Sequence, residues 1–212
     1  MKIDIAPGVI LWPGRFSRPE QEALLGDVLG RIEEAPFYRP QMPRSGKPLS
    51  VEMSNFGSLG WFTDSEKGYR YERRHPLTAK PWPQIPPRLL ALWDETTVYG
   101  ASPEACLVNL YRGSARMGLH RDSDEQATDA PVLSVSLGDA ALFRFGGTSR
   151  RAPTRSLTLS SGDVLMFGGP ARFAFHGVDR IITGSSTLIP GGGRINLTLR
   201  RVFAKAPCQT EY

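Results

Sequence analysis

The sequence predicts a mainly β fold, a sandwich or barrel of antiparallel strands with flanking helices. Short segments with period-2 alternation follow one another after residue 105, separated by Gly, Pro, Ser or Asp. The 22 glycines and 18 prolines are spread along the chain, as many turns require. With 212 residues, the chain is long enough for one domain with a well-buried core.

The first helix is expected over residues 17–35. Ser17 and Glu20 have the spacing of a capping box at a helix N-terminus. Apolar residues then recur at the spacing of one helical face, which predicts the side that packs on the core. They are Leu24, Leu25, Val28, Leu29 and Ile32.

Residues 36–85 are rich in Pro, Gly, Arg and aromatic residues and show no clear period, so we expect a long irregular stretch. Long loops in compact domains are usually lids or binding loops. A second helix is expected after "PWPQIPP", through "RLLALWDETTVYG" to Gly100, with Pro87 in its first turn.

The predicted strands lie between residues 106 and 203. Their sequences are "CLVNLYR", "VLSVSLG", "ALFRFGG", "RSLTLSS", "DVLMFGG", "RFAFHGV" and "RINLTLRRVF". No internal repeat, low-complexity tract or linker divides the chain, which predicts a single domain over residues 1–212. Within it, residues 1–105 supply the helices and loops, and residues 106–203 supply the β core.

Composition and charge narrow the classes of protein. Hydrophobic residues make up 40% and charged residues 22%, which excludes an intrinsically disordered chain. The formal net charge of +5 suits a polyanionic partner such as nucleic acid, a weak indication on its own. Two cysteines, Cys106 and Cys208, exclude a disulfide framework and fit a reducing compartment. Because there is neither a secretory signal nor an apolar run near the roughly 20 residues of a membrane span, the expected location is the cytoplasm.

Two of the three histidines belong to a candidate metal site. In "LHRDSDE", His120 and Asp122 are two residues apart, so in an extended chain their side chains point to the same side. With His176 they would supply two imidazoles and one carboxylate, the ligand set of non-haem Fe(II) oxygenases. The alternatives are a solvated acidic turn at residues 119–125 and a hydrogen-bonded core histidine at 176. The third histidine, His75, has no evident partner and is interpreted as structural.

The last predicted strand, "RINLTLR", has two different faces. The apolar face is expected in the core and consists of Ile195, Leu197 and Leu199. The polar face consists of Arg194, Asn196, Thr198 and Arg200. Two guanidiniums in one row resemble an anion-binding surface, because each can bind a carboxylate through two parallel hydrogen bonds. An exposed, arginine-rich edge strand is the alternative. Asn109 and Tyr111 likewise share one face of "NLY", where either could be an ordinary buried hydrogen-bonding residue.

The motifs occur in a characteristic order. They are "NLY", "LHRDSDE", "PVLSVSLG", "ALFRFGG", "GDVLMFGG", "FHG" and "RINLTLR", preceded by "MSNFGSLGW", "GYRY", "KPWPQIP" and "EACLVNLY". Over about residues 50–203, this set resembles the AlkB family of Fe(II)/2-oxoglutarate-dependent dioxygenases, above all its bacterial alkylation-repair members. The resemblance implies a double-stranded β-helix (jelly roll) as the catalytic core at 106–203 and a nucleotide-recognition lid within 1–105.

The resemblance also implies roles for single residues. His120, Asp122 and His176 would bind Fe(II) and form the catalytic centre. Arg200 would pair with the distal carboxylate of 2-oxoglutarate, and Arg194 with the carboxylate near the iron. The remaining residues of the cosubstrate pocket would be Asn109, Tyr111 and Asn196.

Four residues match family positions on the substrate side: Trp61, Tyr69, Asp124 and Arg150. Trp61 and Tyr69 would line the pocket for the damaged base, where stacking on an indole is worth about 1–3 kcal/mol. Asp124 would lie near the exocyclic amine of the base, and Arg150 near the pocket or the DNA backbone. Ordinary lid packing, a surface acid and a solvated basic loop are the respective alternatives.

The implied activity is oxidative demethylation of N-alkylated nucleic-acid bases, such as 1-methyladenine and 3-methylcytosine, in direct repair of DNA or RNA. Decarboxylation of 2-oxoglutarate by dioxygen would accompany it, with release of formaldehyde and succinate. The expected partner is alkylated single-stranded DNA, or RNA, and the expected protein is a monomer without membrane attachment. A 2-oxoglutarate-dependent hydroxylase of a protein or small molecule and a non-enzymatic nucleic-acid-binding module are the alternatives. Trp61, Tyr69 and the basic loops favour nucleic acid.

Overall fold

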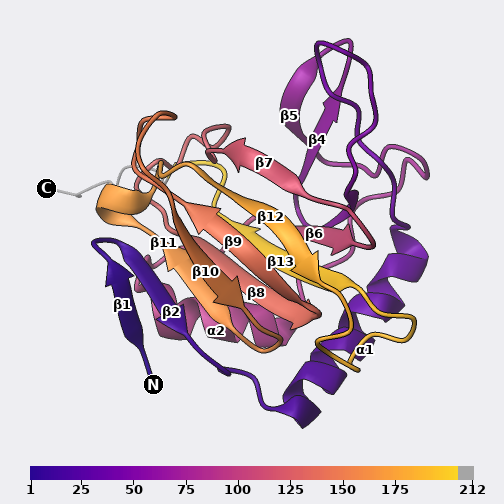
Figure 1. Ribbon diagram of the computed structural model, residues 1–212. Coiled ribbons are helices and arrows are strands. Elements are labelled where there is room, and N and C mark those ends of the chain that lie inside the picture. Colours follow the sequence, from indigo (N-terminus) through magenta and orange to yellow (C-terminus); the bar gives the residue numbers. More distant parts are fainter. Residues whose placement is uncertain (205–212) are drawn as a thin grey trace, which may run out of the picture.

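Two antiparallel β-sheets pack face to face in the computed structural model, which describes residues 1–204 (Figure 1). The larger sheet has seven strands in the order β1-β2-β11-β8-β13-β6-β3, and the smaller has four in the order β10-β9-β12-β7. The strands of the larger sheet are β1 (Ile3–Ala6), β2 (Val9–Trp12), β3 (Glu52–Gly57), β6 (Ala105–Tyr111), β8 (Val132–Gly138), β11 (Val164–Phe167) and β13 (Arg194–Arg200). The strands of the smaller sheet are β7 (Met117–His120), β9 (Ala140–Phe145), β10 (Arg155–Leu159) and β12 (His176–Ile182).

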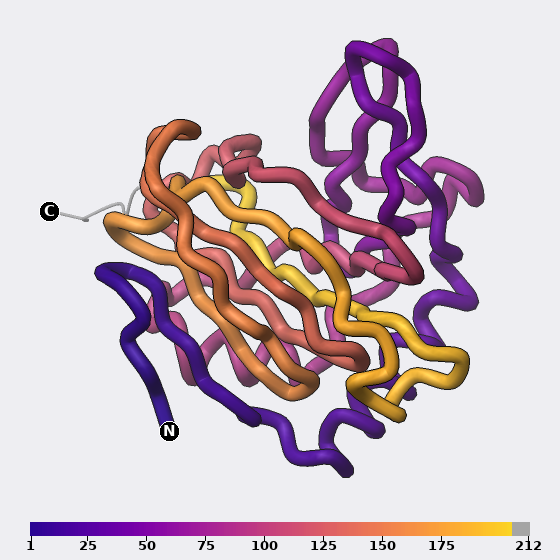
Figure 2. The backbone as a smooth tube through the Cα atoms, viewed as in Figure 1, coloured from indigo at the N-terminus to yellow at the C-terminus, as the bar shows by residue number. Residues whose placement is uncertain are grey.

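Strands β6 to β13 form a double-stranded β-helix. Successive strands cross between the layers except at β9 and β10, which are neighbours in one sheet, so that β6, β8, β11 and β13 belong to the larger sheet and β7, β9, β10 and β12 to the smaller. Figure 2 shows the path of the chain through both layers. The predicted mainly β fold with flanking helices and a jelly-roll core is confirmed.

Two helices, α1 (Arg18–Glu34) and α2 (Pro87–Thr97), cover the outer face of the larger sheet. Helix α1 begins after the predicted capping box, in which the backbone N–H of Ser17 donates to Glu20 Oε2 at 2.8 Å. Helix α2 has the expected proline in its first turn but ends at Thr97 rather than Gly100. It stops there because Val98 adopts the left-handed conformation, with φ of +51°.

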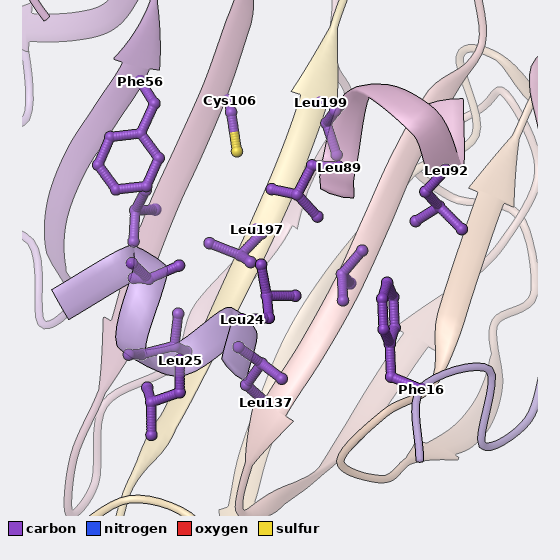
Figure 3. Packing of buried hydrophobic residues seen from close by; sticks show 14 of the residues in the cluster. Phe16, Leu24, Leu25, Phe56, Leu89, Leu92, Cys106, Leu137, Leu197 and Leu199 are labelled. Carbon is purple, nitrogen blue, oxygen red and sulfur yellow. The ribbon is translucent and has the colours of Figure 1, made fainter. Parts of the chain in front are cut away.

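The main hydrophobic core lies between these helices and the larger sheet (Figure 3). Leu24 of α1 and Leu89 of α2 are fully buried against the apolar face of β13. As predicted, that face consists of Ile195, Leu197 and Leu199. Leu29, which helical spacing also assigned to the core, is 43% exposed. A second core fills the space between the two sheets, where the polar face of β13 lies.

The first 105 residues contain more strands than the sequence predicted. Strands β1 and β2 extend the larger sheet at one edge, and β3 extends it at the other by pairing with β6. Strands β4 (Gly60–Asp64) and β5 (Gly68–Glu72) form a separate hairpin that stands apart from both sheets (Figure 1). The expectation of an irregular stretch over 36–85 is therefore wrong for these segments. Strand β3 is buried on both faces, so it lacks the polar alternation that reveals a half-exposed strand.

The segment "RFAFHGV", predicted as one strand, is a strand only from His176 onward. A short 3₁₀ helix, η1 (Gly169–Ala171), and a turn precede it. The turn buries the Arg172 side chain. In the part of the chain that the structure describes, neither helix combines the length and apolar character needed to cross a membrane. Cys106 is buried and unpaired, whereas Cys208 lies outside the described residues.

Candidate metal and cosubstrate site

Strands β7 and β12 bring the three predicted metal ligands together. His120 is the last residue of β7 and His176 the first of β12, and the two pair directly in the antiparallel register. Asp122 follows β7 by two residues, and its side chain is buried. One ligand atom from each residue lies within 4.8 Å of the others, and each imidazole Nε2 is 3.8 Å from an Asp122 oxygen. Two atoms bound about 2.1 Å from one ion are about 3.0–4.2 Å apart, so this spacing fits a shared metal ion.

Gly177 allows the two histidine-bearing strands to approach closely. A Cβ atom at this position would lie 2.5 Å from the carbonyl oxygen of Met117 and 2.8 Å from that of Gly118. Any larger residue would push β7 away from β12. The glycine of "FHG" therefore has a steric role in the metal site.

Hydrogen bonds orient both imidazoles for metal binding. Nδ1 of His120 donates to the Gly118 carbonyl, and Nδ1 of His176 donates to the Ala174 carbonyl, each at 2.9 Å. Because a carbonyl only accepts, each Nδ1 carries a proton, so in the neutral imidazole the lone pair is on Nε2. Burial lowers the pKa of His176 to about 4, so this imidazole is neutral at pH 7.

The Asp122 carboxylate is ionised although it is buried. Burial alone would raise its pKa, but the Arg200 guanidinium and the two imidazoles lower the pKa well below the usual range. Oδ1 accepts a hydrogen bond from Arg200 Nη2 at 2.6 Å. Oδ2 is buried and has no hydrogen-bond partner among residues 1–204. A buried anionic oxygen without a donor fits a ligand to a cation.

The two arginines of β13 lie at opposite ends of the strand. Arg200 contacts the candidate metal ligand Asp122. Arg194 donates from Nη2 to Ser136 Oγ at 2.6 Å and from Nη1 to the carbonyls of Asp139 and Leu159. The resemblance placed Arg200 at the distal carboxylate of 2-oxoglutarate and Arg194 near the iron. In the structure, Arg200 is the arginine that touches a candidate metal ligand, which favours the opposite order.

Both arginines retain a buried donor that could bind an anion. Nε of Arg194 and Nε of Arg200 have no hydrogen-bond partner within the described residues. An unpaired buried guanidinium N–H is destabilising, and a carboxylate would satisfy it. Two such donors at the two ends of one strand fit a molecule with two carboxylates, such as 2-oxoglutarate.

The three other predicted cosubstrate residues differ in whether their side chains already have hydrogen-bond partners. Tyr111 lies opposite Arg194 in the strand register, and burial raises its pKa to about 12, so the phenol is a neutral donor. Asn109 Oδ1 is buried without a partner among the described residues. The Asn196 amide is engaged within the sheet, because Nδ2 donates to Ser134 Oγ and Oδ1 accepts from Thr198 Oγ1.

The hairpin β4–β5 supplies an aromatic pair next to the metal site. The rings of Trp61 and Tyr69 are stacked, with centroids 5.5 Å apart and an interplanar angle of 24°. Trp61 Nε1 donates to Asp124 Oδ2 at 2.8 Å, which ties the hairpin to the loop that carries Asp122. Tyr69 is 54% exposed, and the His120 side chain is 40% exposed, so both are accessible to a large ligand.

Arg150 lies near His120, beside the end of β7. Its Nη1 donates to the Leu119 carbonyl at 3.1 Å, and its guanidinium lies over the Phe175 ring, as does that of Arg121. Arg150 is therefore held beside the end of β7. His75 is far more enclosed: Nε2 donates to the Pro36 carbonyl, and Nδ1 accepts from the backbone N–H groups of residues 77 and 78. These contacts agree with its interpretation as a structural residue.

Sequence reasoning missed three residues of the site. Glu125 is buried and accepts hydrogen bonds from Tyr71, Arg172 and Arg200. Arg172 also donates to the Asp122 carbonyl at 2.8 Å. Glu125 belongs to the acidic cluster "LHRDSDE", so a titratable residue near the ligands was available as a signal. Arg172 and Tyr71 carry no such signal, because only the fold brings them to this place.

Comparisons with known proteins agree with this geometry. Residues 8–200 match the 2OG-Fe(II) oxygenase superfamily. A Caulobacter vibrioides protein named alpha-ketoglutarate-dependent dioxygenase AlkB homolog is 57% identical over 201 residues, 94% of this chain and 90% of the relative. An Arabidopsis thaliana protein named DNA N(6)-methyladenine demethylase ALKBH1C is 31% identical over 230 residues, 93% of this chain and 49% of the relative. The solved structure of OsALKBH1 has a TM-score of 0.79 at 29% identity and covers 95% of this chain and 100% of that chain.

Proposed function

The chain belongs to the AlkB family within the 2OG-Fe(II) oxygenase superfamily, and from this we propose that it oxidatively demethylates N-alkylated nucleic-acid bases. It is a 2-oxoglutarate-dependent dioxygenase that uses Fe(II), 2-oxoglutarate and dioxygen. The proposed substrates are bases such as 1-methyladenine and 3-methylcytosine in DNA or RNA, so the reaction repairs alkylation directly. When bound, the iron would direct an oxidation by dioxygen, in which one oxygen atom converts 2-oxoglutarate to succinate and carbon dioxide and the other hydroxylates the N-methyl group, which then leaves as formaldehyde.

In this proposal, His120, Asp122 and His176 hold the iron. Their three ligand atoms leave other positions on the ion open for cosubstrate and dioxygen. Arg200 binds the cosubstrate carboxylate nearest the metal, because it already contacts Asp122 and has a free Nε–H. Arg194 binds the distal carboxylate. Its free Nε–H and its position at the far end of β13 support this role.

Asn109 and Tyr111 complete the distal end of the cosubstrate pocket. Tyr111 is the strand partner of Arg194, so its phenol O–H is suited to donate to the same carboxylate. Asn109 is the partner of Asn196 on β13, and its side-chain N–H₂ group is suited to donate to an acceptor in the pocket. Asn196 then acts through the sheet, by holding its neighbours in place, since both ends of its amide are already bonded.

The hairpin β4–β5 forms the nucleotide-recognition lid. Trp61 and Tyr69 present stacked aromatic rings to a base, and Asp124 places a carboxylate on the same side. Bases methylated at N1 of adenine or N3 of cytosine are cationic, so both a π-face and an acid favour them over the unmodified bases. A stacked base in a duplex cannot reach the metal, so the substrate is single-stranded or flipped out.

Basic residues near the pocket bind the nucleic-acid backbone. Arg150 and Arg121 lie over Phe175 beside the end of β7, close to His120. The net charge of +5 supports binding to a polyanion. Affinity for the oligonucleotide should therefore fall as salt increases, because each phosphate contact releases counterions.

The observation that carries this proposal is the convergence of His120, Asp122 and His176 at one point, with Arg200 on the carboxylate. The test is incubation with a single-stranded oligonucleotide containing one 1-methyladenine, with formaldehyde and succinate measured together. Both products should require Fe(II) and 2-oxoglutarate, and both should disappear in His120→Ala. An unmethylated oligonucleotide is the control. Succinate without formaldehyde would contradict base demethylation and favour hydroxylation of a different substrate.

We propose that a single chain is the active unit and that it works in the cytoplasm. One chain contains every residue of the proposed site, and its two cysteines fit a reducing compartment. A monomer would elute from a sizing column at the mass of one chain, 23.4 kDa, at the concentrations used for activity.

A further inference from the structure

We propose that Glu125 is a positioning residue that fixes both Arg200 and the metal ligand Asp122 and connects them to the lid. This inference rests on the proposed function only in placing the metal and 2-oxoglutarate in this pocket. Glu125 follows Asp122 by three residues, and its side chain is fully buried. A buried carboxylate is stable only when donors surround it, so the identity of its donors indicates its role.

Both oxygens of Glu125 accept hydrogen bonds from site residues. Oε1 accepts from Arg200 Nη1 at 3.1 Å and from the Tyr71 hydroxyl, and Oε2 accepts from Arg172 Nη2 at 3.0 Å. The carboxylate thus holds two guanidiniums and one phenol at once. Charge-assisted hydrogen bonds of this kind are stronger than neutral ones and fix the geometry of their partners.

Each guanidinium that Glu125 holds also holds Asp122. Arg200 Nη2 donates to the Asp122 side chain at 2.6 Å, and Arg172 Nη1 donates to the Asp122 backbone carbonyl at 2.8 Å. The side chain and the main chain of the metal ligand are therefore fixed by two arginines that share one carboxylate. The four charges balance, because two carboxylates face two guanidiniums, all of them buried.

Tyr71 extends this network to the lid. It lies on β5, and its hydroxyl donates to Glu125 and accepts from Arg200 Nη1 at 3.2 Å. Trp61 on the paired strand β4 bonds to Asp124, so the hairpin is attached to the ligand loop at two adjacent acids. A base bound between the lid and the metal would therefore contact a hairpin that is hydrogen-bonded, through Tyr71, to Arg200.

The test compares Glu125→Gln with Ser54→Ala in Co(II) binding, measured anaerobically by visible absorption, and in the KM for 2-oxoglutarate. In Glu125→Gln, the side-chain N–H₂ group would face a guanidinium or a phenol that also donates, so a hydrogen bond would be lost. The volume of the side chain would be almost unchanged. Loss of an outer partner of a metal site typically weakens metal binding roughly 10–100-fold. We expect the Co(II) Kd and the KM for 2-oxoglutarate each to rise about 10-fold or more, with a smaller change in kcat.

Ser54→Ala is the matched control for a structural effect. Ser54 is fully buried on β3, and its hydroxyl donates to the Ala35 carbonyl at 2.7 Å rather than to a site residue. This variant should lower the thermal midpoint while leaving the Co(II) Kd and the KM for 2-oxoglutarate at wild-type values. If Glu125→Gln behaves in the same way, the positioning role is refuted.

Tyr71→Phe decides the question if Glu125→Gln does not fold. It removes one hydroxyl, so the KM for 2-oxoglutarate should rise about 10-fold, the size of one hydrogen bond to a charged group, with unchanged Co(II) binding. An unchanged KM would overturn the link to the lid. A wild-type protein that binds Co(II) and 2-oxoglutarate but releases no formaldehyde from methylated oligonucleotide would refute the proposed function, while the binding data for Glu125 would still stand.

Discussion

Substitution of Gly177 by alanine should weaken metal binding by a steric displacement of strand β7. The added Cβ would lie 2.5 Å from the Met117 carbonyl oxygen, whereas ordinary van der Waals contact begins at 3.4 Å. The strands must therefore separate by about 0.9 Å, since backbone atoms cannot rotate away as a flexible side chain can. His120 moves with β7, because its Nδ1 is bonded to the Gly118 carbonyl, the second atom that the new Cβ meets.

A displacement of this size exceeds what a metal site tolerates, because ligand distances vary by only about 0.2 Å. We expect the Co(II) Kd of Gly177→Ala to rise roughly 10–100-fold, which corresponds to about 1.4–2.7 kcal/mol. The assay is an anaerobic Co(II) titration followed by visible absorption. The thermal midpoint of the metal-free protein shows in parallel whether the variant is folded.

Gly118→Ala is the matched control, one strand away from the same site. A Cβ at Gly118 would meet no atom within 4 Å, so this variant should bind Co(II) like the wild type. If Gly177→Ala binds Co(II) as tightly as Gly118→Ala, the steric account of the "FHG" glycine is refuted.

Three further predictions concern substrate, cosubstrate and pH. Trp61→Ala should raise the KM for methylated oligonucleotide by a factor that corresponds to the roughly 1–3 kcal/mol of one base stack. The KM for 2-oxoglutarate should be unchanged in the same formaldehyde assay. Arg194→Lys keeps the charge but loses the fork geometry, so calorimetry should find 2-oxoglutarate affinity lowered about 10-fold and Co(II) affinity unchanged. Burial lowers the pKa of His75 and brings that of His176 to about 4, below the 6.5 of an unperturbed imidazole. The unfolded chain therefore binds more protons, and the thermal midpoint of the metal-free protein should fall from pH 6.5 toward pH 4; a constant midpoint would contradict this.

Alternation of polar and apolar residues was sufficient to predict strand β13 and its two faces. In β13, every second residue from Ile195 to Leu199 is buried against the helices, as period 2 requires. The same rule placed Asn109 and Tyr111 on the face toward the smaller sheet. Helix α1 was predictable for a similar reason, since its cap and its apolar spacing are local properties of the sequence.

The order of the two arginines could not be derived from the strand. Alternation shows that Arg194 and Arg200 share a face, but it does not show which end of the strand lies near the metal. That depends on where the loop after β7 places Asp122, and the loop contacts the Arg200 end. The resemblance named the residues of the proposed pocket, and the fold is the basis for their proposed order.

The network around Glu125 was beyond sequence reasoning for a different reason. Its members come from β5, the ligand loop, the turn after η1 and the end of β13, and the Arg172–Glu125 pair spans 47 residues. Arg172 was assigned to a strand because "RFAFHGV" alternates, yet it belongs to a turn. A buried arginine in a turn leaves no periodic signal. Similarly, β3 was missed because burial on both faces removes alternation.

Strand β13 has a consequence for how this protein could be engineered. The partition between the helical layer and the cosubstrate pocket is one backbone thick, with Leu197 on one side and Asn196 and Thr198 on the other. A bulkier or smaller residue at Leu197 would shift the same backbone that anchors Arg194 and Arg200. Heat resistance and affinity for 2-oxoglutarate are thus not separable properties at this strand. A variant that is stabilised by repacking the core between β13 and the helices should therefore also be tested for its KM for 2-oxoglutarate.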